Sequence, residues 1–188
     1  MSAVATTAVV ILCAVTGFWF LGQGRLALSS SGAVPVRGGD HPRLENLVRG
    51  LADDLGVETP SLWLIPSGEP NALVTRWPSP IIAVSRGLLE TYNRTELEAV
   101  IAHCLVRVGD KTTMRRSSIA VALRSQGGVE VGGLDDRAAA SVTHYPPALA
   151  AAIDKAHPAA ERFAPFWFVA RGRCHRDPDS RVAEILDL

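Results

Sequence analysis

The stretch Thr95-Glu-Leu-Glu-Ala-Val-Ile-Ala-His-Cys-Leu-Val-Arg107 lies in the middle of the chain and decides how the rest is interpreted. Its apolar residues recur at helical spacing, which predicts one buried stripe along a helix. Asn93 lies just before the stretch and Glu96 follows three residues later, the spacing of a capping box with Asn as the N-cap. The stretch is therefore predicted to be the central helix of a folded domain.

The end of this helix contains part of a metal-binding motif. In a His-Glu-x-x-His zinc site, two His ligands at positions i and i+4 share one helical face, and a Glu general base follows the first. Here these positions hold His103, Cys104 and Arg107, so only the first ligand is present. A thiol ordinarily has a pKa of about 8.5, so it is poorly suited to act as the general base. An arginine side chain has no lone pair to offer to a metal. Cys104 is interpreted as a small buried hydrophobic residue.

The rest of the chain predicts a mixture of helices and short strands. A helix begins at His41-Pro42, because Pro suits the first turn, and Gly56 ends it. Short apolar runs bounded by Pro and Gly predict strands. The predicted strands are 61–65, 72–77, 81–85 and 166–169, and the further predicted helices are 87–92, 134–143, 146–156 and 179–188.

The N-terminal segment is predicted to be a membrane anchor. Residues 3–22 contain no charged side chain, and about 20 apolar residues suffice for a helix to cross a hydrocarbon layer of about 30 Å. Trp19 near the end of this run suits the membrane interface. We therefore expect an anchor at 1–24, a flexible Ser- and Gly-rich tether at 25–40 and a folded domain at 41–188.

The basic residues near this segment predict its orientation. Arg25, Arg37 and Arg43 follow the apolar run and no Lys or Arg precedes it, so the positive-inside rule predicts a single-pass protein of the cell membrane with a cytoplasmic domain. A cleaved signal peptide, which would leave a secreted binding domain, is the alternative. It normally carries a basic n-region and an Ala-x-Ala site, and neither is present here.

Composition argues against two other classes of protein. The formal net charge is zero, so nucleic acid is not an expected partner. The three cysteines, Cys13, Cys104 and Cys174, are irregularly spaced and odd in number, which fits neither a disulfide framework nor a CxxC zinc site.

Six segments carry a resemblance to a known family when they are taken in order. They are Pro60-Ser-Leu-Trp-Leu-Ile65, Asn71-Ala72, Ile82-Ala-Val-Ser-Arg-Gly-Leu-Leu89, Glu96-Leu-Glu-Ala-Val-Ile-Ala-His103, Asp135-Asp136-Arg137-Ala-Ala139 and His175-Arg-Asp-Pro-Asp-Ser-Arg181. Their order and spacing resemble the HtpX and CAAX-prenyl-protease family of zinc metallopeptidases. The resemblance implies an α+β fold, a helix-rich metallopeptidase-like domain with a small sheet, here preceded by one N-terminal transmembrane helix.

The resemblance also implies where a third zinc ligand would lie. In the family a ligand Glu precedes the Asp of an Ala-Asp pair by four residues. If Asp136 matches that Asp, the ligand position is Gly132, and Glu130 lies two residues out of register. Asp136 is then available to pair with Arg107 in place of the metal, which predicts that Arg107 has a carboxylate within about 6 Å.

The former cleft is expected to include Asn71, Asp136, His175 and Arg181, because these residues match family segments. A cysteine-protease site with Cys104 as nucleophile and His175 as base is a further alternative, but no motif supports it. Cys174 and His175 are adjacent in sequence and do not supply a metal site at useful spacing.

The predicted function is that of a membrane-anchored, catalytically inactive pseudoprotease, attached to the membrane through residues 3–22. It would bind a peptide or a protein partner through the former cleft, or serve as a subunit of a membrane complex, with no cofactor. The alternative is an active membrane-bound zinc metalloendopeptidase with an atypical ligand set, which would need zinc. Arg107 is the residue that separates the two.

Overall fold

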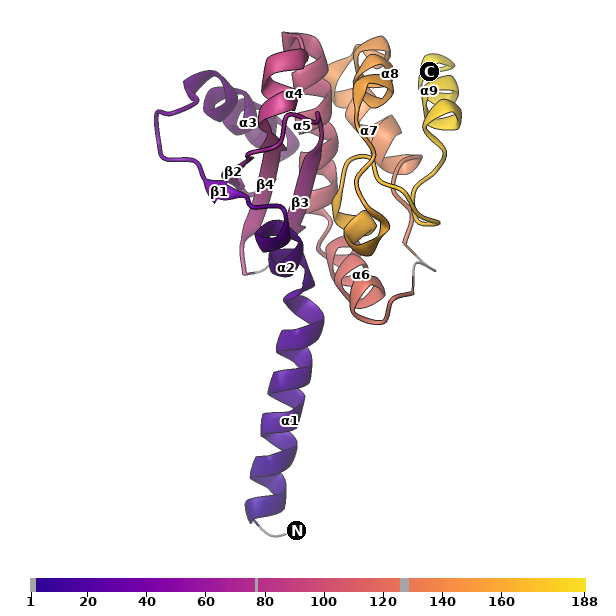
Figure 1. Cartoon of the computed structure of the whole chain (residues 1–188). Helices are drawn as coiled ribbons and strands as arrows, with labels where there is room; N and C mark the ends of the chain where they lie inside the picture. Colours follow the sequence, from indigo (N-terminus) through magenta and orange to yellow (C-terminus); the bar gives the residue numbers. More distant parts are fainter. Residues whose placement is uncertain (1–2, 77, 126–128) are drawn as a thin grey trace.

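The structure, a computed structural model, describes residues 3–76, 78–125 and 129–188. It is a helix-rich α+β fold in which a small mixed sheet has helices on both faces, with one long helix standing away from the domain (Figure 1). The helices in chain order are α1 Ala3–Leu21, α2 Gln23–Ser30, α3 Pro42–Leu55, α4 Arg86–Thr91, α5 Arg94–Gly109, α6 Lys111–Ala122, α7 Leu134–Thr143, α8 Pro146–Lys155, the 3-10 helix η1 Glu161–Phe166 and α9 Pro178–Leu186.

The sheet has four strands in the order β1-β2-β4-β3. They are β1 Val34–Pro35, β2 Ser61–Ile65, β3 Ala72–Arg76 and β4 Pro80–Ser85. β2 runs parallel to β4, whereas β1 and β3 are antiparallel to their neighbours. β4 is buried along its whole length, which explains its continuous apolar run. The three strands predicted between 61 and 85 are confirmed, and Trp77, the last residue of the predicted 72–77 strand, lies outside the described residues.

Alternate side chains of the sheet enter two separate hydrophobic cores, because neighbouring residues of a strand point to opposite faces. On one face Val74, Ile82 and Val84 pack among residues of α3, α5 and α8. On the other face Leu73, Ile81 and Ala83 pack against α2 and η1. Both faces of the small sheet are therefore covered.

The central helix α5 forms as its sequence predicts. Asn93 Oδ1 accepts a hydrogen bond from the Glu96 amide at 2.9 Å, and Glu96 Oε2 accepts one from the Asn93 amide at 3.1 Å, so the capping box is confirmed. Lys155 of α8 also donates to Glu96. α5 packs against β3 and β4 on one side and against α3, α7 and α8 on the others, which makes it the centre of the larger core.

The segment predicted as a flexible tether, 25–40, contains regular structure, although most of its residues are exposed. α2 lies on the sheet with Ala27 and Leu28 buried, and Gly24 lets it approach so closely that an added Cβ would lie 1.7 Å from the Thr75 hydroxyl oxygen. β1 then pairs with β2. α2 thus provides apolar cover for the second sheet face, which local Ser and Gly content does not reveal, while the bounds and the flexibility of the tether stay predictions.

The predicted strand at 166–169 is also absent. Phe166 ends η1, and the next residues touch β3 through an isolated bridge between Trp167 and Leu73. The Asn71 side chain donates to the Val169 carbonyl at 2.7 Å and accepts from its amide at 3.3 Å. The Val169 carbonyl also accepts a hydrogen bond from the Ala159 amide at 3.1 Å, so a side chain and an isolated backbone bond satisfy these groups in place of a strand ladder.

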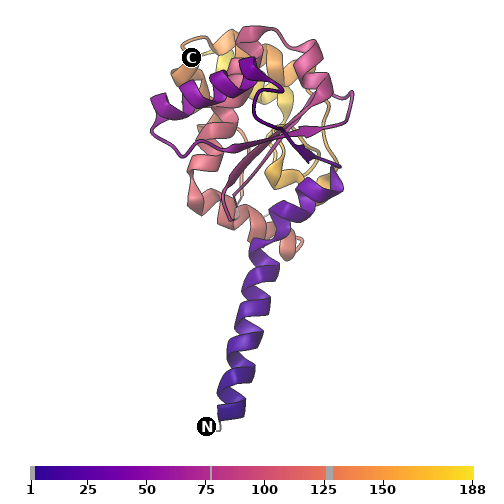
Figure 2. The ribbon, with the colours of Figure 1, turned by 90° about the vertical axis from the view of Figure 1, so that its left-hand side faces the viewer.

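α1 extends from the domain, as Figure 2 shows from a second direction. Its apolar side chains, among them Val9, Ile11 and Leu12, are exposed. Within the described residues no single helix is long and apolar enough to cross a membrane. α1 and α2 reach the required length and hydropathy only together, across a 44° bend. The predicted anchor at 1–24 and the single transmembrane helix therefore stay predictions, and residues 1–2 lie outside the described part.

Candidate functional site

One face of α5 meets α7 and α9 in a buried cluster of charged side chains. His103 and Arg107 lie one helical turn apart on α5, so they project from the same face. They are 0% and 1% exposed, and α7 and α9 supply Asp136 and Arg181, which are equally buried. Together with Asp135, whose side chain is 20% exposed, they form the buried charge cluster, which occupies the place where the sequence predicts a former metal site. Its members are His103, Arg107, Asp135, Asp136 and Arg181.

His103 is held as a neutral imidazole. Its Nδ1 lies 2.9 Å from Asp136 Oδ1, and Nε2 has no hydrogen-bond partner among the described residues. The ring meets the Phe168 ring edge-on, with 5.0 Å between centroids. Burial lowers the pKa of His103, and this effect outweighs the opposing pull of the Asp136 carboxylate.

Asp136 forms its strongest contacts with Arg181. The Arg181 Nε and Nη2 atoms each donate to Asp136 at 2.7 Å, a bidentate pair, while Nη1 donates to the Phe168 carbonyl at 3.0 Å. Burial tends to raise the pKa of Asp136, but the hydrogen bonds from Arg181, with the contact to His103, hold that pKa well below its usual range. Asp136 is therefore ionised and fully engaged.

The predicted pairing of Arg107 with Asp136 is wrong, although Arg107 does meet a carboxylate. Its Nη1 donates to Asp135 Oδ2 at 2.5 Å and its Nη2 donates to the Pro165 carbonyl at 2.9 Å. Adjacent residues of a helix point about 100° apart, so α7 presents Asp135 to one arginine and Asp136 to the other. Sequence reasoning missed Asp135 as a site residue, and its position beside Asp136 in the first turn of α7 was the available signal.

The position of the general base is fully enclosed. Cys104 is 1% exposed within the larger core, as expected of a small hydrophobic residue. Burial raises the pKa of its thiol to about 12, and the positive charge of Arg107 lowers it only in part. The group is therefore a protonated thiol at neutral pH, unsuited to act as a base or as a nucleophile.

The position expected for a third ligand, Gly132, lies close against other side chains. Gly132 has a φ of +107°, and a Cβ added there would lie 2.8 Å from Arg181 Nε and 3.1 Å from Asp136 Oδ2. Any larger residue would meet the Asp136–Arg181 pair. Glu130 is no substitute, because its side chain is 66% exposed and lies 3.5 Å from Arg176, outside the cluster.

The structure brings some of the predicted cleft residues together and leaves others apart. Asp136 and Arg181 join His103 in the buried charge cluster. Asn71 instead clamps the start of β3, where its amide donates to the carbonyls of His157 and Val169. His175 Nε2 lies 2.8 Å from the Ala164 carbonyl, and burial, with a smaller effect of nearby arginines, lowers the pKa of its imidazole to about 3.

The residues of this cluster do not fit a zinc ion. Zinc needs several N, O or S lone pairs arranged around it, and one of the motif positions is a guanidinium. Asp136 is committed to Arg181, and no group of three His, Cys, Asp or Glu side chains within the described ranges is placed to hold a metal. The buried arginine and the enclosed ligand positions disagree with a metal site of the His-Glu-x-x-His type.

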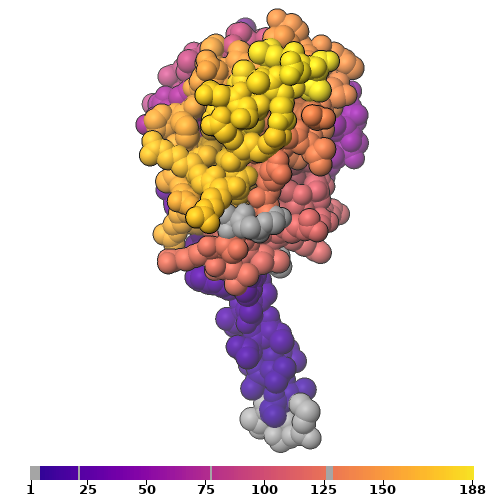
Figure 3. All heavy atoms as spheres, turned by 90° about the vertical axis from the view of Figure 1, so that its right-hand side faces the viewer, coloured from indigo at the N-terminus to yellow at the C-terminus, as the bar shows by residue number. Residues whose placement is uncertain are grey.

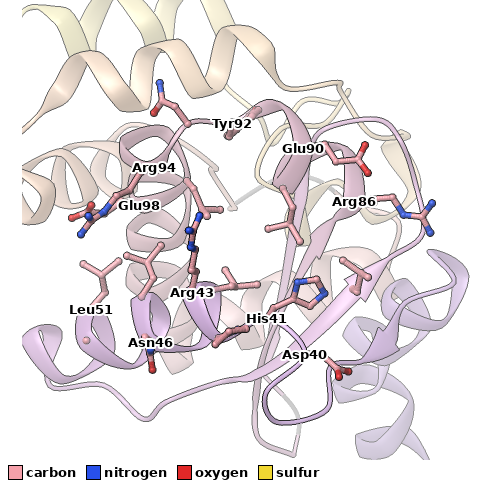
Figure 4. A pocket seen from close by; sticks show the side chains of 18 of the residues that line it. Asp40, His41, Arg43, Asn46, Leu51, Arg86, Glu90, Tyr92, Arg94 and Glu98 are labelled. Atoms are coloured by element: carbon pink, nitrogen blue, oxygen red, sulfur yellow. The ribbon is translucent and has the colours of Figure 1, made fainter.

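A separate groove lies near the N-terminal half of α5. It has a volume of about 1330 Å³ and lies between α3, α4 and α5 (Figure 4). Leucines from all three helices and from β2 line its floor, and charges of both signs border it. The leucines are Leu44, Leu47, Leu51, Leu64, Leu89 and Leu97; the bordering charged residues include Asp40, Arg43, Arg86, Glu90, Arg94 and Glu98.

Comparisons with known proteins match the part of the chain that contains this central helix. Residues 40–161 match the family model described as Peptidase family M48. The chain is also similar to proteins named Protease HtpX homolog. That of Thermococcus sibiricus is 42% identical over 82 residues, which is 43% of this chain and 28% of the relative. The protein of Thermococcus kodakarensis is 40% identical over 96 residues, which is 50% of this chain and 32% of the relative. The protein of Pyrococcus abyssi is 35% identical over 106 residues, which is 55% of this chain and 36% of the relative. The matched part of the chain thus spans only about a third of the length of these relatives.

Proposed function

The chain belongs to peptidase family M48, and from this premise we propose that it is a membrane-anchored pseudoprotease, whose metal site has been replaced by a charge cluster. The observation that carries the proposal is the Arg107 guanidinium, buried at the second ligand position and bonded to Asp135 and to the Pro165 carbonyl. This cation cannot donate a lone pair and cannot lose its charge at neutral pH.

Electrostatics favours the arginine over a zinc ion at this place. A charge of +1 at 4 Å from a charge of +2 costs roughly 8 kcal/mol at an effective dielectric constant near 20. A structural zinc site supplies about 10–16 kcal/mol, so most of that gain would be lost. The two guanidinium groups of the cluster instead balance the two carboxylates, and the fold keeps its neutral interior without metal.

The direct test is the zinc content of the full-length chain purified in detergent, beside His103→Gln and a peptidase assay on an unfolded protein substrate. We expect substoichiometric zinc that His103→Gln does not change, and no hydrolysis. Stoichiometric zinc that is lost in His103→Gln, or hydrolysis inhibited by a chelator, would establish the second candidate, an active zinc metalloendopeptidase. That candidate is favoured by the name of the relatives, which are called proteases.

A reversal variant sharpens this test. Cys104→Glu combined with Arg107→His rebuilds His-Glu-x-x-His on α5. Zinc should still fail to bind tightly, because Gly132 supplies no third ligand and Arg181 fills the space around it. Tight, stoichiometric zinc in the reversal variant would show that the two α5 positions alone had excluded the metal.

Binding of a partner is proposed at the groove between α3, α4 and α5, because the former active-site residues are too deeply buried to contact a peptide. The leucine floor suits a peptide segment with an apolar face, and the mixed rim suits flanking charges of both signs. A random peptide library selected on the full-length chain provides the probe. Selected peptides should lose binding to Gly50→Glu, which projects into the groove, and keep binding to Gly68→Glu. Both glycines have open space for a side chain. Equal binding to both variants would refute the groove.

Membrane attachment through α1 is proposed on its exposed apolar side chains, which include Val9, Val10, Ile11 and Leu12. Leaving such a helix in water would expose far more apolar surface than a monomeric soluble domain normally does. The cytoplasmic side is proposed from the basic residues that follow the anchor. A Leu186→Cys variant in sealed membrane vesicles tests the side. An impermeant thiol reagent should label it only in inside-out vesicles, and labelling in right-side-out vesicles would reverse the assignment.

A further inference from the structure

The second half of α6 exposes apolar side chains at the end of the domain from which α1 emerges. Ile119 and Leu123 are 43% and 60% exposed and lie four residues apart, hence on one helical face. α6 packs against α1 and α2, and Figure 1 shows the turn after α6 at the level where α1 leaves the domain. In the space-filling view the salmon surface of α6 lies along the lower edge of the domain beside α1 (Figure 3).

Neighbouring elements extend this apolar surface around a cavity. Trp19 of α1 and Leu26 of α2, both exposed, border a cavity of about 500 Å³ whose other walls are the end of α6 and η1. The surface is continuous with the exposed apolar side chains of α1. We call Trp19, Leu26, Ile119 and Leu123 the basal patch.

The charges around the basal patch are predominantly positive. Residues 111–125 contain four basic side chains and no acidic one. Arg124 and Arg162 line the cavity itself, with Glu161 as the acidic residue among its lining residues. An apolar surface bordered by arginines complements a bilayer that presents acyl chains beneath anionic headgroups.

Arg124 occupies a backbone position that normally favours glycine. Its φ is +52°, and it is the C′ residue of a Schellman motif in which Ser125 N donates to the Ala120 carbonyl and Arg124 N to the Val121 carbonyl. A non-glycine residue in this left-handed conformation is strained. An arginine therefore lies at the rim of the cavity in a position where a glycine would fit the backbone better.

We propose that the basal patch docks on the membrane surface, with Ile119 and Leu123 in the headgroup region and with Arg124 and Arg162 bound to the phosphates of anionic lipids. The docked face fixes the domain against the bilayer instead of letting it swing on its anchor. This inference rests on the proposed membrane attachment through α1, and it is independent of whether the domain hydrolyses peptides.

The experiment uses the full-length chain with Cys13 replaced by Ser, reconstituted in vesicles of phosphatidylcholine alone or with phosphatidylglycerol. An environment-sensitive fluorophore is attached to Leu123→Cys or, as the matched control, to Leu186→Cys. The control position is a leucine of similar exposure, 57%, and lies on α9 at the far end of the domain from α1. Quenching from water and from lipids brominated on their acyl chains reports which probe is in the membrane.

We expect the probe at 123 to be quenched by brominated lipid in anionic vesicles and to become accessible to the aqueous quencher in neutral ones. The probe at 186 should stay in water in both. Arg124→Gly should lower the ratio of docked to undocked domain about fivefold, since one basic residue near an anionic surface contributes about that factor. The same variant should unfold at an equal or higher denaturant concentration, because glycine relieves the backbone strain.

Two failures can be told apart. If the chain does not remain with the vesicles after an alkaline wash, the proposed attachment through α1 fails. If it remains but the probe at 123 behaves like the probe at 186, the docking of the basal patch is refuted while the attachment stands. High salt should weaken docking in the wild type, because it screens charges at the surface. Docking that resists salt, or that Arg124→Gly leaves unchanged, would overturn the role of the arginines.

Discussion

The pair of Asp136 and Arg181 gives the sharpest test of how the buried charge cluster holds the domain together. It joins α7 to α9 through two hydrogen bonds of 2.7 Å between side chains that are almost completely buried. Replacing Asp136 by Asn keeps the volume and removes the charge, which leaves the Arg181 guanidinium buried without its counter-ion. Breaking a buried pair in this way costs about 3–5 kcal/mol, a large share of the total stability of roughly 5–15 kcal/mol.

The double variant Asp136→Asn with Arg181→Met separates an unpaired charge from lost packing. Because it removes the unpaired cation, it should recover much of the stability that the single variant loses. Urea unfolding of the full-length chain in detergent, followed by circular dichroism, measures each midpoint. Asp53→Asn, an exposed carboxylate on α3, is the control and should change the stability by about 0.5 kcal/mol or less.

The pH dependence of stability provides an independent test of the Asp136–Arg181 pair. The pKa of Asp136 is lower in the folded than in the unfolded chain, so its contribution to stability is present above the unfolded pKa of about 3.9 and is lost as the pH falls through the folded value. The wild type should therefore lose stability below about pH 4 more steeply than Asp136→Asn. A single variant that costs less than about 1 kcal/mol, or a double variant no more stable than the single one, would refute the reasoning.

Other predictions concern single groups. Burial lowers the pKa of His175 to about 3, so below about pH 6 the unfolded chain binds a proton that the folded chain does not. The free energy of unfolding should therefore fall by up to about 1.4 kcal/mol per pH unit in this range. Urea titrations at several pH values should show a smaller slope for His175→Asn. Asn93→Ala should cost about 1–2 kcal/mol because the capping box is lost, and an unchanged denaturation midpoint would contradict that. Gly24→Val should lift α2 off the sheet, because a Cβ there would lie 1.7 Å from a β3 hydroxyl oxygen, and limited proteolysis within 25–40 should become faster. In mass spectrometry a thiol reagent in detergent should modify exposed Cys13 long before Cys104, whose thiol is buried with a pKa of about 12.

Some elements could be predicted because their signals are local. The capping box of Asn93 and Glu96 lies within four residues, and the apolar stripe of α5 repeats within one helix. The structure of the segment 25–40 could not be predicted from local signals in the same way. α2 is short and contains Gly and Ser, and its helix is held by contacts with residues of β3 and η1 that lie far along the chain.

The candidate site also has features that local sequence predicts and features that depend on tertiary packing. The sequence by itself determined that His103, Cys104 and Arg107 share the end of one helix and that the chain belongs to a peptidase family. Because arginine stays protonated, the sequence also indicated that a buried Arg107 needs a counter-ion. Only the tertiary structure decided which carboxylate that is. Asp135 and Asp136 are adjacent in sequence, but the placement of α7 against α5 and α9 turns one toward Arg107 and the other toward Arg181. Ion pairing depends on distances of a few ångströms between elements packed from distant parts of the chain, and residue spacing along the sequence does not fix such distances.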